Sequence, residues 1–275
     1  MSTGSKVDED IYVQFIDQQP HTYGESDIGN SNSLNLEVAS QIDDGSGHSS
    51  YHTTSLMGLT YALASIDQLI AHSIHHNDIN VEFSGTEPLL NRQLIRQVTE
   101  YTQKQAKQKH LWVNFAVTTN ANFLTSSDAQ FFAKHKFEVT VNINGPKTTN
   151  DKKNATTKDK NQYYNALRGV GYLRSHKPAK LNTQVNVTPL TPGLLPLLQH
   201  MIALGFEKIE FIPQLSTLEH EPEYSTKQLD RFMIEIAECS SYAKNYLPPE
   251  KRFSFRDFDA LPQKKALLAG AGNFF

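Results

Sequence analysis

Residues 83–91 read Phe83-Ser84-Gly85-Thr86-Glu87-Pro88-Leu89-Leu90-Asn91, and this stretch decides the fold class. It follows a short apolar run and leads into a helix. Its proline stands in the first turn of that helix, where the backbone N–H would have no partner within the helix. Residues 80–84 are therefore predicted to form a strand, and residues 92–107 the helix that follows it. The same change from strand to helix recurs along most of the chain.

The other elements follow from apolar periodicity and turn residues. A strand is expected over residues 11–16, before a loop rich in Gly, Ser, Asn and Asp over residues 18–33. Apolar residues at helical spacing from Leu56 to Ile70 predict the first helix, with Thr54 or Ser55 as its cap. Further strands are expected over residues 112–118, 138–143, 182–188 and 208–212, and helices over residues 126–135, 162–175, 192–204 and 226–244. Strand, helix, strand units with short turns predict right-handed crossovers and a parallel sheet.

The predicted strands alternate between apolar and polar side chains, which point to opposite faces of a sheet. The apolar set would pack under the helices, while a row of amides, hydroxyls and carboxylates lines the other face. Buried polar groups are costly without partners or water, so we expect a wet, ligand-sized cavity inside a partial barrel. A mixed sheet with one solvent face is the alternative. The polar set is Glu82, Ser84, Asn114, Thr118, Thr140, Asn142, Asn144, Gln184, Asn186, Thr188 and Glu210.

Composition indicates a globular protein without a strong overall charge. The chain has 275 residues, 38% of them hydrophobic, and a formal charge of -3 that argues against nucleic acid and anionic membranes as partners. No apolar stretch reaches the roughly 18 residues of a membrane span, and residues 1–10 contain no signal-peptide core. We therefore expect a cytoplasmic protein. The single cysteine, Cys239, excludes an internal disulfide and a site built only from cysteines.

Several stretches resemble the radical S-adenosylmethionine (SAM) enzymes, in particular the peptide-maturing and sulfatase-maturing group with a SPASM or twitch extension. Residues 84–90 resemble its SGGEPLL signature, residues 117–125 its TTNGTLLT, and residues 141–147 its SISLDGPK. The resemblance implies an α/β fold with a partial (β/α)6 TIM-type barrel over residues 34–245. It also implies an N-terminal strand and polar segment over residues 1–33, and a truncated SPASM/twitch-like remnant over residues 246–275.

The resemblance also implies a set of degenerate SAM-site positions at the strand ends. Glu87 would either orient a ligand or satisfy backbone amides at the helix start, and the two interpretations weigh equally. Asn120 and Asn144 would bind a ligand or close turns, the turn being slightly favoured at Asn144. The positions are Ser84, Gly85, Thr86, Glu87, Pro88, Thr119, Asn120, Asn144 and Gln184. No catalytic residue is assigned.

The family holds its iron–sulfur cluster on a CxxxCxxC loop after the first strand, and this chain has no cysteines there. Leu34, Val38 and Gln41 would stand at the cysteine positions, and Ala269 at a cysteine of the auxiliary cluster. Because such clusters are held by cysteine thiolates, the sequence predicts that the chain has no [4Fe-4S] cluster. No other cofactor is expected either, except that the sequence leaves open whether SAM binds.

Other candidate sites have simpler interpretations. His72, His75 and His76 follow the last apolar residues of a helix, where cations suit the helix dipole, and no third ligand accompanies them at recognisable spacing. No metal site is expected from them, nor from His48 and His52. Cys239 has no paired cysteine or evident base and is expected to be inert.

Three functions are compatible with this sequence. The first is a pseudoenzyme of the radical SAM maturase family, a peptide-recognition or regulatory partner of an active maturase in peptide maturation. The second is an enzyme that binds SAM or another small molecule for non-radical chemistry, with Glu87 orienting an amine. In the third, a partner protein supplies the cluster ligands.

Overall fold

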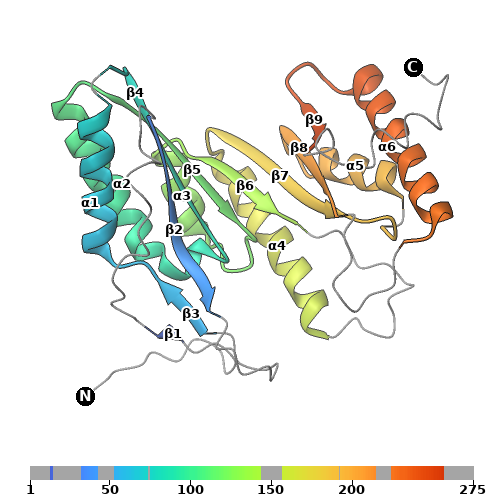
Figure 1. Cartoon of the computed structure of the whole chain (residues 1–275), viewed down its shortest axis with the longest axis horizontal. Coiled ribbons are helices and arrows are strands. Elements are labelled where there is room, and N and C mark those ends of the chain that lie inside the picture. The colour runs from blue at the N-terminus through green and yellow to red at the C-terminus, as the bar shows by residue number, and fades with distance from the viewer. Residues whose placement is uncertain are drawn as a thin grey trace. The chain divides into compact units, whose positions relative to one another are not determined.

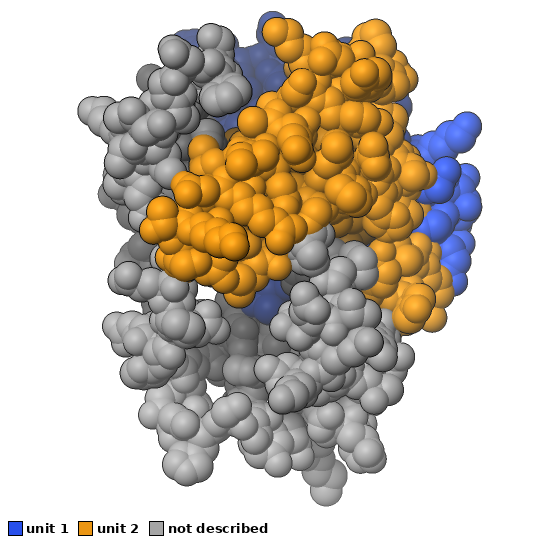
Figure 2. Space-filling view, turned by 90° about the vertical axis from the view of Figure 1, so that its right-hand side faces the viewer, with its two compact units in different colours: residues 1–140, 171–180 blue, residues 141–170, 181–275 orange. Residues whose placement is uncertain are grey.

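The computed structural model of the chain describes residues 13–14, 32–42, 53–73, 75–143, 157–191, 193–214 and 224–256 (Figure 1). The chain divides into two compact units, which Figure 2 colours separately. The first unit comprises residues 1–140 and 171–180, and the second comprises residues 141–170 and 181–275. The boundaries predicted at residues 34 and 245 stay predictions.

The first unit is built on strands that follow the order β1-β3-β2-β4-β5. Strand β2 is parallel to β4, β4 is parallel to β5, and β3 is antiparallel to β2. The strands are β1 (Val13–Gln14), β2 (Ser33–Ile42), β3 (Thr53–Leu56), β4 (Asp78–Gly85) and β5 (Trp112–Thr119). The helices are α1 (Leu59–His72), the 3-10 turn η1 (Pro88–Asn91), α2 (Arg92–Gln108) and α3 (Ser126–Lys134).

The second unit contains three parallel strands in the order β7-β8-β9. They are β7 (Lys180–Val187), β8 (Lys208–Pro213) and β9 (Arg252–Phe255), and the helices between them are α5 (Leu194–Ala203) and α6 (Thr226–Tyr246). Strand β6 (Glu138–Asn142) and helix α4 (Thr157–His176) contain residues of both units, and so does β7, whose first residue Lys180 belongs to the first unit.

Together these elements make an α/β fold with a parallel sheet of seven strands, β2 and β4 to β9, and six α-helices among the described residues. The predicted fold class is confirmed. No described helix has an apolar stretch long enough to cross a membrane.

The alternation of the strands places the core where it was expected. Val81, Phe83 and Phe115 are buried on one face of the first unit, and the Phe115 ring stacks on Phe137 at 5.2 Å between centroids. Helices α1 and α2 bury apolar residues at helical spacing, such as Ile66 and Val98. Burial of each large apolar side chain contributes about 1.5–3 kcal/mol, so this face holds the unit together.

Two local expectations were wrong. The predicted loop over residues 34–41 lies within strand β2, because Leu34 and Leu36 alternate with Asn35 and Glu37 and the run pairs in parallel with β4. Helix α1 is capped by Gly58 and not by Thr54 or Ser55, since residues 53–56 pair with residues 39–42 as strand β3. Of the strand expected over residues 11–16, the structure describes Val13–Gln14 as β1.

Candidate functional site

A cavity of about 630 Å³ lies on the polar face of the first unit. Its lining comes from β2, β4 and β5, from the starts of β6 and β7, and from the residues just before these two strands. The side chains that carry charge or amide groups are Asn35, Asn80, Glu82, Asn114, Lys136, Glu138 and Lys180. A polar cavity of ligand size is therefore present on this face of the unit, while its hydration and its enclosure in a partial barrel stay predictions.

Hydrogen bonds between neighbouring strands fix the amide side chains of this cavity. Asn114 Nδ2 donates to Asn80 Oδ1 at 3.0 Å and to Asp78 Oδ2 at 3.1 Å. Asn80 Nδ2 donates in turn to Ser33 Oγ at 3.2 Å. Asn80 and Asn114 are register partners in β4 and β5. The amides are thus held in defined orientations before any ligand arrives.

The charges in the cavity are nearly balanced. Glu138 Oε2 and Lys180 Nζ form an ion pair at 3.0 Å, and Glu82 Oε1 accepts a hydrogen bond from Thr118 Oγ1 at 3.1 Å. Lys136 adds a second cation to the lining. A balanced set of this kind suits a polar ligand without a large net charge.

At the carboxyl end of β4, Glu87 joins two strands. Its Oε1 accepts hydrogen bonds from Leu89 N at 3.0 Å and Thr119 Oγ1 at 2.7 Å, and its Oε2 accepts one from Asn120 N at 2.9 Å. Glu87 is 3% exposed. Burial raises the pKa of this carboxyl, while the bonds from Thr119, Asn120 and Leu89 act in the opposite direction. This geometry favours the structural interpretation of Glu87 over the ligand-orienting one.

Gly85 is explained by the approach of strand β2. It has a φ of 121°, and a Cβ there would collide with the carbonyl oxygen of Ala39. The next amide, Thr86 N, donates to that same oxygen at 2.7 Å. The backbone of β2 therefore occupies the space that the glycine leaves open.

The remaining residues predicted at the SAM site lie in different environments and are not all in one unit. Ser84 Oγ donates to Asn35 Oδ1 at 2.6 Å, and Pro88 and Thr119 are buried. Asn120 Oδ1 accepts from Asn122 N at 2.9 Å and so closes a turn. Gln184 lies in the second unit, where its Nε2 donates to Glu210 at 3.3 Å. Asn144 and Ala269 lie outside the described residues. The assignment of these positions to SAM stays a prediction.

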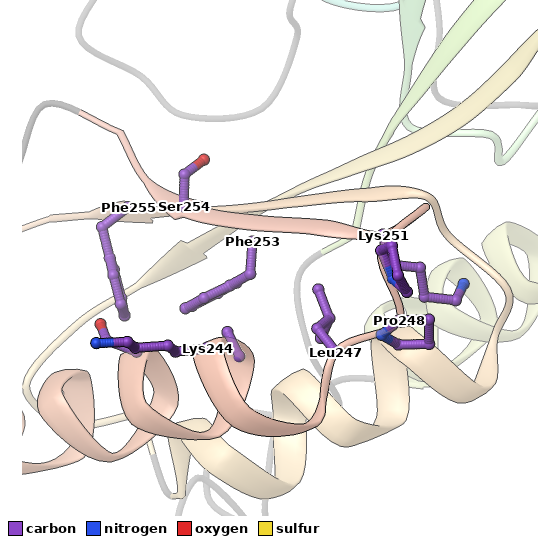
Figure 3. Close-up of a pocket in the computed structure, with 10 residues that line it drawn as sticks. Lys244, Leu247, Pro248, Lys251, Phe253, Ser254 and Phe255 are labelled. Carbon is purple, nitrogen blue, oxygen red and sulfur yellow. The ribbon is translucent and has the colours of Figure 1, made fainter.

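A second cavity, of about 420 Å³, lies between helix α6 and strand β9 (Figure 3). Figure 3 shows Phe253 and Phe255 pointing from the strand toward the helix, with Ser254 pointing away. Both rings make edge contacts with Phe211, and Lys251 Nζ donates to the carbonyl oxygen of Phe206 at 2.6 Å. Most of this lining is thus engaged in packing the second unit.

The described residues contain no group of three His, Cys, Asp or Glu side chains that could hold a metal ion. His72 Nδ1 lies 2.8 Å from Gln68 O on its own helix, and His48 and His52 fall outside the described residues. Cys239 is fully buried in α6, and burial raises the pKa of its thiol to about 12. A thiol in this state is a poor metal ligand and a poor nucleophile.

Cys239 should therefore react slowly with alkylating reagents in the folded protein. We expect iodoacetamide at neutral pH to modify it at least about a hundredfold more slowly than in guanidinium chloride, because the reaction requires local opening. Mass spectrometry over time measures both rates on the only thiol of the chain. Equal rates would show that the side chain is accessible in the folded state.

Three kinds of comparison place this fold among known proteins. Residues 47–165 match a family described as a 4Fe-4S single cluster domain. An uncharacterized protein of Methanocaldococcus jannaschii, MJ0907, is 28% identical over 136 residues, which make up 49% of this chain and 46% of that protein. The chain thus spans less than half of this curated relative.

Solved structures with bound S-adenosylmethionine (AdoMet) share the fold. The structure of anSMEcpe with bound AdoMet and the Kp18Cys peptide matches with a TM-score of 0.63 and 19% identity, covering 86% of this chain and 66% of that one. SuiB from Streptococcus suis, bound to S-adenosylmethionine, matches with a TM-score of 0.57 and 13% identity, covering 85% of this chain and 53% of that one. The chain therefore shares the fold of these two structures.

These matches contradict the expectation that no iron–sulfur cluster belongs to this protein. A 4Fe-4S family model and structures with bound AdoMet point instead to a cluster and to SAM. The residues that the structure describes do not fit a cluster on their own, because the only thiol is buried in α6 and no metal-binding group of three side chains is present among them. We therefore derive no chemical step through a cluster from this chain.

Sequence reasoning missed several residues of the polar cavity, namely Asn35, Asn80, Glu138 and Lys180. It also missed Trp112, which is 77% exposed and lies two residues before Asn114 in β5, hence on the same face. The period-two alternation already identified Asn114 and Glu82, and extending it to the starts of β4 and β5 would have found Asn80 and Trp112.

Proposed function

We propose that this chain is the peptide-recognising partner of an active radical SAM maturase. In this proposal, the partner supplies ligands for the cluster to which the family match points. The maturase-like fold supports it, and so does the shortage of ligands among the described residues of this chain. The structure of anSMEcpe, whose fold is similar, contains a bound peptide.

The polar cavity of the first unit carries the peptide part of this proposal. Its side-chain amides and its ion pair can exchange hydrogen bonds with a polar chain in both directions. Its volume of about 630 Å³ accommodates a few residues of a peptide. Non-radical SAM chemistry with Glu87 orienting an amine is less favoured, because both oxygens of Glu87 already accept hydrogen bonds within the chain.

Anaerobic purification of the tagged full chain from its native cells tests the partnership. Co-purifying polypeptides are identified by mass spectrometry, and iron and acid-labile sulfide are measured in the same fractions. We expect a radical SAM polypeptide in stoichiometric amount, with the iron following the complex. A chain that elutes alone under gentle conditions, from cells that contain such an enzyme, would contradict the proposal.

A further inference from the structure

We propose that the amino-terminal half of the polar face in the first unit binds an extended peptide segment. Side-chain amides of this face would bond to the main-chain N–H and C=O groups of the peptide, and the peptide would pack on Trp112. We call this surface the amide face and define it by Asn35, Asn80, Asn114 and Trp112. That the ligand is a peptide rests on the proposed function; the location and the recognition chemistry rest on the observations that follow.

The amide face lies at the opposite end of the strands from Glu87. Trp112 and Asp78 are the first residues of β5 and β4, and Asn114 and Asn80 are the third, whereas Glu87 follows the last residue of β4. At about 3.3 Å per residue, the five steps from Asn80 to Gly85 separate the two regions by roughly 16 Å. Asn80, Asn114 and Trp112 therefore lie well away from Glu87, whereas Asn35 borders the SGGEP-like motif because its Oδ1 accepts a hydrogen bond from Ser84 Oγ.

The amides are arranged across three neighbouring strands. Ser33, Asn80 and Asn114 share one level of the sheet, since Ser33 pairs with Asn80 and Asn80 pairs with Asn114. Asn35 lies one pleat further along β2, opposite Glu82. With strands about 4.8 Å apart, the side chains form a ladder that an extended chain can follow.

Among the described residues, Asn114 keeps an acceptor and Asn35 keeps a donor for a ligand. Asn114 donates both of its N–H groups to Asp78 and Asn80, which leaves its Oδ1 as an acceptor. Asn35 accepts from Ser84 through Oδ1, which leaves its Nδ2 as a donor. Different residues of an extended peptide offer both complementary groups, N–H and C=O, along the roughly 10 Å that separate β2 from β5. Because the side chains are already oriented, little entropy is lost when they bind.

Trp112 supplies apolar contact at the edge of this ladder. The side chain is 77% exposed at the first position of β5, on the same face as Asn114. Exposed Trp residues beside polar groups are typical of binding surfaces, because the ring gives a large contact area at low entropic cost. The near balance of charge in the cavity disfavours an anionic ligand and suits a peptide main chain.

Fluorescence of Trp112 provides a direct test, because the chain has no other tryptophan. The probe is a random-sequence pool of acetylated, amidated peptides without tryptophan, added to the full chain, and a maltooligosaccharide mixture is added in a second arm. We expect a saturable change in Trp112 emission with the peptides only. The variants Asn114→Leu and Asn35→Ala should each weaken binding about tenfold, while Asn245→Leu, exposed on α6, should not.

Asn35→Ala serves as the second variant should Asn114→Leu fail to fold, since Asn35 is exposed. Its loss removes a donor and the acceptor of Ser84 Oγ without disturbing the Asn80 and Asn114 pair. A response to the saccharide alone, no response to peptides, or peptide binding unchanged in Asn35→Ala would overturn the inference. Failure here is distinguishable from failure of the proposed function. A maturase that co-purifies with a chain unable to bind peptides refutes the amide face and peptide recognition but leaves the partnership standing. Peptide binding without a co-purifying maturase refutes only the partnership.

Discussion

The variant Gly85→Ala should lose about 3 kcal/mol or more of its free energy of unfolding. The new methyl group would collide with the carbonyl oxygen of Ala39, a backbone atom that cannot move without breaking the pairing of β2 with β4. The φ of 121° adds strain for any residue with a Cβ. Urea unfolding followed by circular dichroism measures the change.

Gly171→Ala is the matched control for this prediction. Gly171 lies in α4, is exposed, and has open space around the position of a Cβ. The same substitution should there stabilise the protein by about 0.5–1 kcal/mol, because alanine is the better helix former. Similar effects of the two substitutions would show that the close approach of Ala39 does not determine the need for glycine at position 85.

Removal of the Glu87 carboxylate should cost about 3–5 kcal/mol, because Glu87→Ala leaves two buried donors and one half-buried donor without an acceptor. The donors are Leu89 N, Thr119 Oγ1 and Asn120 N. Glu87→Gln retains the shape and one acceptor oxygen, so it should cost less, about 1–3 kcal/mol. Urea unfolding of both variants near neutral pH measures these losses, and a loss below experimental error for Glu87→Ala would contradict the structural role.

The same carboxyl predicts a pH dependence of stability. Burial raises its pKa in the folded protein, so the folded state binds this proton more tightly than the unfolded state does. The proton-linked part of the Glu87 contribution is thus full below the pKa of the unfolded chain and is lost as the pH rises through the higher folded pKa, while the hydrogen bonds that Glu87 accepts remain. The difference in free energy of unfolding between the wild type and Glu87→Gln, measured from pH 4 upward, should fall across this window. If this difference in free energy of unfolding rises with pH instead, the pKa of Glu87 is lowered by folding and the prediction is wrong.

The fold could be predicted because the local pattern and the tertiary packing agree. Val81, Phe83 and Phe115 alternate with polar residues, and the structure buries this apolar set under helices with the expected spacing. Strand β2 was missed because its sequence was compared with a cysteine motif, although Leu34 and Leu36 alternate as a strand should. Strand β3 was missed because its four residues acquire their structure only by pairing with β2.

The site was harder to predict because its parts lie far apart in the sequence. The role of Glu87 depends on donors from Thr119 and Asn120, more than thirty residues away, so the sequence could not separate the two interpretations. The Asn80 and Asn114 ladder depends on the register between β4 and β5, which alternation alone does not fix. Residue types therefore indicated a polar face, and only the register showed which side chains meet.

We propose separate roles for Glu87, which holds the strand ends together, and for the amide face, which binds peptide. Peptide affinity, measured by Trp112 fluorescence in Glu87→Gln and Asn35→Ala under conditions where both are folded, tests this separation most directly. We predict that Glu87→Gln binds the peptide pool as the wild type does, whereas Asn35→Ala binds about tenfold more weakly. Loss of binding in Glu87→Gln together with unchanged binding in Asn35→Ala would contradict the account.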